Sequence, residues 1–146
     1  MARRGQKIAT VFVDSSVLFT AVNSPTGGSA KLFALSQLKL TTSQLVLTEV
    51  ERNVRGKLQS YHLERFLTLV SRLEVRQTTI DERAIGEARR VIVQKDATIL
   101  AEAKKARADY LVTLDRKDFF NEKVRKFAAP GKIVTPGQLI ALIEGK

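Results

Sequence analysis

The sequence contains no cysteine, and this absence removes several kinds of chemistry. Disulfide bonds, thiol nucleophiles and thiolate metal sites are all excluded. No apolar run approaches the roughly 20 residues of a membrane span. The basic start MARRGQK is followed by an apolar run that contains Asp14, which is not typical of a signal peptide. We therefore expect a cytoplasmic protein, because a chain without cysteine is compatible with a reducing compartment.

Histidine is scarce as well, and aromatic residues are few. The single histidine, His62, has no metal-ligand spacing around it, so packing or surface exposure explains it better than metal binding. No tract alternates aromatic and basic residues, so stacking of nucleic-acid bases is not indicated.

Positive charge, in contrast, is abundant. Lysine and arginine total 25 against 15 acidic residues, which gives a net charge of +10 and a pI near 10.2. Such a field suggests a polyanionic partner, most simply nucleic acid. A solvated surface or adaptation to heat is the alternative explanation. Individually, the basic clusters are no more than solvated faces: Arg52, Arg55 and Lys57; Lys104, Lys105 and Arg107; Lys123, Arg125 and Lys126.

Short β-branched runs alternate with amphipathic segments along the chain. We expect strands at residues 8–13, 40–43, 74–77, 110–114 and 132–134, and helices at 17–19, 28–38, 44–58, 63–73 and 79–93, from 95 onward and from 135 onward. This alternation predicts an α/β fold with a mostly parallel sheet of about four to five strands, covered by helices on both faces. The length fits one domain. We expect residues 1–7 to form a basic tail and residues 8–146 to form that domain.

Two of the expected helices carry apolar stripes. In segment 44–58 the stripe is flanked by Glu49 on one side and Glu51 on the other, and the helical wheel does not choose between these acids. In segment 63–73 the aligned residues are Leu63, Phe66, Leu67, Val70 and Leu73. Both stripes fit either the core or a surface for a partner.

Acidic side chains follow the predicted strands or begin a predicted helix. Asp14 and Asp115 each come directly after a strand, and parallel strands place such residues at the same sheet edge. Asp96 opens a helix, on the same face as its apolar residues, and Asp118 follows Asp115 by three positions. Clustered carboxylates repel one another unless they are neutralised, and Mg²⁺ or Mn²⁺ is the usual partner of oxygen ligands.

Each acid taken singly has an ordinary explanation. An aspartate after a strand is often a helix cap or a turn former. Asp118 is open to that interpretation, and Asp109 is expected on the surface. The arrangement of several acids together is harder to explain in this way.

The acidic segments taken together resemble the PIN domain family, in particular the single-domain VapC-type ribonucleases, over nearly the whole chain. VFVDSSVL resembles the first strand and first acid, at Asp14, and SQLVLTEV resembles the segment with the second acid, at Glu49. DATILAEA resembles the third motif, at Asp96. YLVTLDRKDF resembles the fourth, at Asp115, with Asp118 as an additional acid found in many members.

The sequence departs from the family at Ser16, where many members carry asparagine. A hydroxyl can still hydrogen-bond a carboxylate or a metal-bound water, and Thr113 could do the same from the last motif. Arg116 and Lys117 have no fixed role in the family pattern.

The resemblance implies metal-dependent hydrolysis of RNA phosphodiester bonds. Asp14, Glu49, Asp96 and Asp115, with Asp118, would hold one or two Mg²⁺ or Mn²⁺ ions, and Ser16 and Thr113 would support them. It also implies the toxin of a toxin–antitoxin pair, held inactive by a small antitoxin protein, and a homodimer.

Several alternatives stay open. The chain could be a non-cleaving PIN-like RNA-binding or regulatory domain, or a PIN nuclease in RNA processing. Phosphoryl transfer through an aspartyl-phosphate is disfavoured: a dehalogenase-like fold needs an acid where Ser16 stands, and a receiver needs acids ahead of Asp14, where none occurs. A purely structural protein would leave the acids at the strand ends unexplained.

Overall fold

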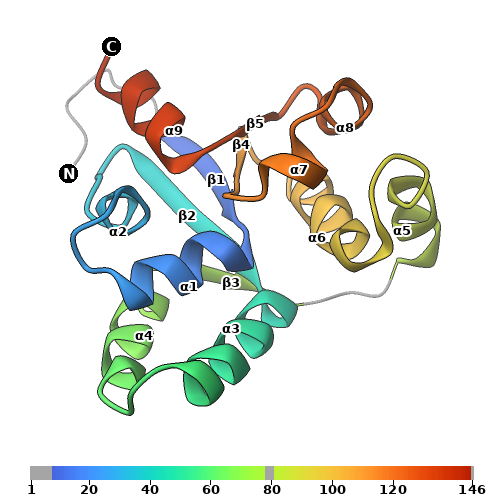
Figure 1. Cartoon of the computed structure of the whole chain (residues 1–146). Helices are drawn as coiled ribbons and strands as arrows, with labels where there is room; N and C mark the ends of the chain where they lie inside the picture. The colour runs from blue at the N-terminus through green and yellow to red at the C-terminus, as the bar shows by residue number, and fades with distance from the viewer. Residues whose placement is uncertain (1–7, 78–80, 146) are drawn as a thin grey trace.

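A computed structural model describes residues 8–77 and 81–145. The expected tail, residues 1–7, and residues 79 and 80, at the start of the helix expected at 79–93, lie outside the described residues. The described chain forms a five-stranded sheet in the order β3-β2-β1-β4-β5, and every pairing is parallel (Figure 1). The strands are β1 (Ala9–Val13), β2 (Leu38–Ser43), β3 (Glu74–Arg76), β4 (Tyr110–Val112) and β5 (Lys132–Val134). The predicted α/β fold with a parallel sheet is confirmed.

Helices cover both faces of this sheet (Figure 1). One group packs together and consists of α1 (Ser15–Asn23), α2 (Gly28–Leu32), α3 (Gln44–Lys57), α4 (His62–Val70) and α9 (Pro136–Ile143). The second group consists of α5 (Glu82–Ala88), α6 (Gln94–Lys105) and α8 (Glu122–Ala128). A single turn, α7 (Arg116–Phe119), follows β4. Because both faces are covered, Val11, Phe12 and Val13 of β1 are completely buried.

Local capping explains where two of the helices begin. Ser43 ends β2 and accepts a hydrogen bond from the backbone N–H of Val46, so it caps α3. Thr135 and Gln138 form a capping box at the start of α9, and Pro136 occupies its first turn. The last helix therefore begins where the sequence predicts, at residues 135–136.

Three helices are shorter in the structure than the sequence predicts. The helix expected at 28–38 ends at Leu32, because the chain must turn before β2 begins at Leu38. The helix expected at 79–93 is reduced to α5, because Val93 takes an extended conformation and becomes the cap of α6. The helix expected at 63–73 ends at Val70.

The apolar stripe of α4 also differs from the prediction. Leu67 is 64% exposed, whereas Leu69, which the predicted stripe omitted, is 1% exposed. The face that packs against α1 and α3 is centred on Phe66 and Leu69, so Leu67 is rotated away from the core.

The order of the strands creates a switch point between β1 and β4. The chain leaves β1 toward one face of the sheet and leaves β4 toward the other (Figure 1). Crevices at such points, beyond the carboxyl ends of the strands, are where open α/β sheets bind ligands.

Within residues 8–77 and 81–145, no helix has both the length and the apolar character required to cross a bilayer.

Candidate metal centre

The pairing of β1 with β4 brings Asp14 beside Thr113. Val13 is in register with Val112, and the N–H of Asp14 donates to the carbonyl oxygen of Val112 at 3.1 Å. Asp14 and Thr113 are the next residues along each strand, and both are buried. The Asp14 carboxylate and the Thr113 hydroxyl thus lie side by side at the carboxyl ends of β1 and β4.

Two hydroxyl groups fix the Asp14 carboxylate. The Oγ of Ser16 donates to Asp14 Oδ2 at 2.8 Å, and Oγ1 of Thr113 donates to the same oxygen at 2.7 Å. Ser16 Oγ in turn accepts from the N–H of Leu114 at 3.1 Å, and Thr113 Oγ1 accepts from the N–H of Asp115 at 3.1 Å. The carboxylate therefore has its orientation set by groups from both strand ends.

Glu49 reaches this group through Ser15. The Oγ of Ser15 lies 3.3 Å from Glu49 Oε1 and 3.5 Å from Asp14 Oδ1, and can donate to either oxygen. Glu51, the other acid left open by the helical wheel, instead forms an ion pair with Arg55 at 3.0 Å. The structure thus places Glu49 on the side of α3 that faces α1.

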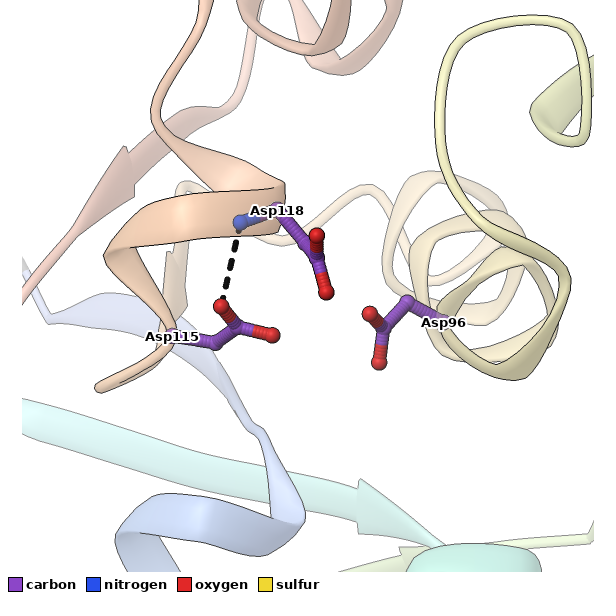
Figure 2. Close-up of side chains that lie close together, drawn as sticks. All are labelled: Asp96, Asp115 and Asp118. Carbon is purple, nitrogen blue, oxygen red and sulfur yellow. Dashed lines mark hydrogen bonds between the residues drawn. The ribbon is translucent and has the colours of Figure 1, made fainter.

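Asp115 and Asp118 are held by the turn α7. Asp115 caps this turn, because its Oδ1 accepts from the N–H of Asp118 at 3.0 Å. The Asp118 carboxyl group consequently lies next to that of Asp115 (Figure 2).

Asp96 approaches these two acids from the opposite side. It lies in the first turn of α6, and its carboxyl group points toward Asp115 and Asp118 (Figure 2). One oxygen from each of the three carboxyl groups lies within 4.8 Å of the others. Among the described residues this is the one acidic group so closely spaced, and Asp14 and Glu49 are outside it.

The pKa of Asp96 reflects this crowding. Its pKa is raised to about 7, and burial of the carboxyl group is the largest cause. Asp118 contributes to this rise, because the two facing carboxyl groups can share a hydrogen bond only when one is protonated, and so do the charges of Asp115 and Asp14. Lys95 lowers it by a smaller amount.

The residues present fit a divalent cation. Asp96 Oδ2 is buried and has no hydrogen-bond partner in the described chain, an arrangement that is costly for a polar oxygen unless a ligand completes it. The donors are carboxylate oxygens, which suit Mg²⁺ and Mn²⁺. Asp96, Asp115 and Asp118 would form the centre of such a site, with Asp14 and Glu49 at its margin.

Asp14 and Asp115 could be predicted because each follows a strand, and Asp96 because it lies at the start of a helix, whereas Glu49 was indicated only by the resemblance to the PIN family. Ser15 was not predicted. The role of Ser15 depends on the packing of α1 against α3, which brings together residues 34 positions apart. No pattern in the sequence signals that contact.

Comparison with known proteins agrees with this fold. Of solved structures, VapBC2 from Rickettsia felis bound to a DNA fragment from its promoter is 20% identical, with a TM-score of 0.68 over 86% of this chain and 98% of that chain. A toxin–antitoxin complex from Klebsiella pneumoniae is 20% identical, with a TM-score of 0.62 over 86% and 97% of the two chains. PAE2754 from Pyrobaculum aerophilum is 16% identical, with a TM-score of 0.61 over 97% and 100%.

Among curated protein sequences, no match is found. The family model of the PIN domain, however, matches residues 11–126, a range that includes Asp14, Glu49, Asp96, Asp115 and Asp118. Because that match spans most of the sequence, the chain belongs to the PIN domain family.

Proposed function

We propose that this protein is a metal-dependent endoribonuclease that hydrolyses phosphodiester bonds of RNA. The observation that carries the proposal is the carboxyl group of Asp96. It has a buried oxygen without a hydrogen-bond partner among the described residues, and one of its oxygens lies within 4.8 Å of oxygens of Asp115 and Asp118. Three acids held this close favour a hard cation. Membership of the PIN family supports a nuclease, and the net charge of +10 supports a polyanionic substrate.

The residues of the site have separate roles in this proposal, as metal ligands or as positioning groups. Asp96, Asp115 and Asp118 bind Mg²⁺ or Mn²⁺ directly, and Asp14 and Glu49 bind at the same centre or orient its water. Ser16 and Thr113 keep the Asp14 carboxylate in place. The bound cation supplies an activated water and neutralises charge on the scissile phosphate.

The proposal extends to partners. The Rickettsia felis and Klebsiella pneumoniae structures are both described as VapBC or toxin–antitoxin assemblies. By extension, this protein is the toxin of such a pair and a small antitoxin inhibits it. Two copies of this chain form a homodimer. Sedimentation of the isolated protein tests the dimer: a monomer at micromolar concentration contradicts it.

The test of the activity is cleavage of a pool of structured and single-stranded RNA with Mg²⁺, with Mn²⁺ or with EDTA. Wild type is expected to cut only with a metal, and Asp96→Asn is expected to lose at least a hundredfold in rate, because it removes a charged ligand at the centre of the cluster. Asp109→Asn is the matched control. Asp109 is exposed and directly precedes β4, at the end of the sheet opposite to the acids. An asparagine there can still accept the hydrogen bond from the N–H of Thr10.

The outcomes separate the alternatives. Equal cutting by Asp96→Asn and wild type refutes the assignment of the site. An absence of cutting by folded wild type, together with salt-dependent RNA binding, favours the non-cleaving RNA-binding domain.

A further inference from the structure

Two arginine side chains converge on one aromatic ring next to the metal centre. Phe120 directly follows α7, and its ring centroid lies 5.7 Å from the Cζ of Arg116 and 5.7 Å from the Cζ of Arg125. Arg116 comes from α7 and Arg125 from α8. Guanidinium groups at this distance are attracted by the ring, so Phe120 restricts both side chains.

Within residues 8–77 and 81–145, neither guanidinium group is neutralised by an acid. In the described part of the chain, Arg116 and Arg125 form no ion pair, although Lys126 on the same helix pairs with Glu122 at 3.1 Å. Two like charges near one ring repel each other, and an anion bound between them would remove that repulsion. Guanidinium groups match the geometry of phosphate oxygens with two parallel hydrogen bonds.

This pair of arginines adjoins the acids without belonging to their cluster. Arg116 lies between Asp115 and Asp118 in the sequence. Phe120 follows α7, one turn after Arg116, and its N–H donates to the carbonyl oxygen of Arg116 at 3.2 Å. Asp118 lies about 200° around the helix from Arg116. The acids of α7 therefore face α6 (Figure 2), while Arg116 faces Phe120 and α8.

We infer that Arg116 and Arg125, oriented by Phe120, form a phosphate subsite for the RNA strand beside the scissile bond. This inference rests on the proposed function. The subsite would hold a phosphodiester group one or more nucleotides from the metal centre, and so guide the backbone past Asp96, Asp115 and Asp118. RNA is favoured over an acidic protein, because the same strand must place a phosphate at the adjoining metal centre.

The experiment measures affinity for a labelled single-stranded oligoribonucleotide of mixed sequence, in EDTA and at several KCl concentrations. The double variant Arg116→Gln/Arg125→Gln is compared with Arg72→Gln/Arg107→Gln. The control removes the same charge from exposed residues that precede β3 and β4, at the opposite edge of the sheet. Because EDTA excludes cleavage, and any repulsion by the acids is common to all variants, the comparison reports only on the arginines.

The double variant at the subsite is expected to bind about tenfold more weakly. The slope of log affinity against log salt is negative, and it should become less steep by about 0.7 for each lost phosphate contact. The control should change little, and Arg116→Lys/Arg125→Lys should recover part of the affinity. Equal loss in both glutamine doubles would show a non-specific effect of charge and overturn the subsite. Unchanged RNA binding, with lost binding of an acidic protein partner, would overturn it as well.

The nuclease proposal has a separate outcome. If selective loss of RNA binding is seen but wild type cuts no RNA with Mg²⁺ or Mn²⁺, the subsite stands and the catalytic proposal fails. If wild type cuts RNA and the arginine variants bind normally, the catalytic proposal stands and the subsite fails.

Discussion

Asp96 is the residue at which the candidate metal centre and the stability of the fold are coupled. Its carboxyl group is half-buried, it faces Asp115 and Asp118, and its pKa is raised to about 7. Ionising such a group in the folded chain is unfavourable unless a cation is present. The same property that favours metal binding therefore destabilises the metal-free protein at neutral pH.

A pH dependence follows for the metal-free protein. An unfolded aspartate has a pKa near 3.9, whereas Asp96 in the fold has a pKa of about 7. Between these values the folded state binds more protons than the unfolded state, so the free energy of unfolding falls as pH rises from about 5 to 7.5. Thermal unfolding in EDTA at several pH values measures this decline.

Asp96→Asn provides the control for that measurement. This variant should be more stable than wild type at pH 7.5 in EDTA, and its stability should vary less with pH over the same range. Added Mg²⁺ or Mn²⁺ should raise the unfolding temperature of wild type but not of the variant. A variant with the wild-type pH profile would show that another group causes the decline.

Thr113 gives a second prediction for a single residue. Its hydroxyl donates to Asp14 and accepts from the N–H of Asp115, and it is completely buried. Thr113→Val keeps the shape but leaves both partners with fewer hydrogen bonds, so we expect a loss of roughly 1–3 kcal/mol in stability and at least about tenfold in metal affinity. Calorimetric unfolding and metal titration measure the two effects.

Thr113→Ser retains the hydroxyl and is the matched variant for that experiment. It should keep most of the metal affinity while losing some packing. If valine and serine weaken metal binding equally, the hydroxyl has no part in orienting Asp14.

Among the elements, the strands could be predicted from the sequence and several helix ends could not. The run around Val11 and Phe12 is short, β-branched and uncharged, which is typical of a strand buried on both faces. The end of α2 at Leu32 and the short α5 depend on where the chain must turn to reach the next element. Asp14, Asp96 and Asp115 followed from strand and helix ends, and Glu49 came from the resemblance to the PIN family. The Ser15 contact with Glu49 depends on how two helices pack.

Gly131 lies in the connection between α8 and β5, where the backbone is closely packed. A Cβ added at Gly131 would lie 2.7 Å from the backbone oxygen of Ala108 and 3.2 Å from that of Ala128. Gly131→Ala should therefore force the backbone to shift and cost roughly 1–3 kcal/mol. Denaturant unfolding measures the loss.

Gly86→Ala is the paired substitution within a helix. Gly86 lies inside α5, and an added Cβ there meets none of the described residues within 4 Å. Alanine favours the helix, so this variant should gain about 0.5–1 kcal/mol. A Gly131→Ala variant that is as stable as wild type would contradict the steric argument at Gly131.

At the scale of the whole molecule, net charge governs the response to salt. The chain carries a charge of +10, and its described ion pairs lie between exposed or half-exposed side chains. Exposed pairs contribute little, so screening them loses little, whereas screening the repulsion among the excess cations stabilises the fold. Raising KCl from about 20 to 200 mM should therefore raise the unfolding temperature by roughly 2–4 °C. A lower unfolding temperature at higher salt would show that the ion pairs outweigh the repulsion.

The strand order also bears on how the protein is made. Asp14 is translated well before Asp118, and β4 remains at the edge of the sheet until β5 pairs with it. A growing chain on the ribosome therefore carries the first acid long before the full set of acids can assemble. If the proposed activity is correct, the ribosome and the messenger being read are not exposed to a working nuclease until synthesis has passed Asp118.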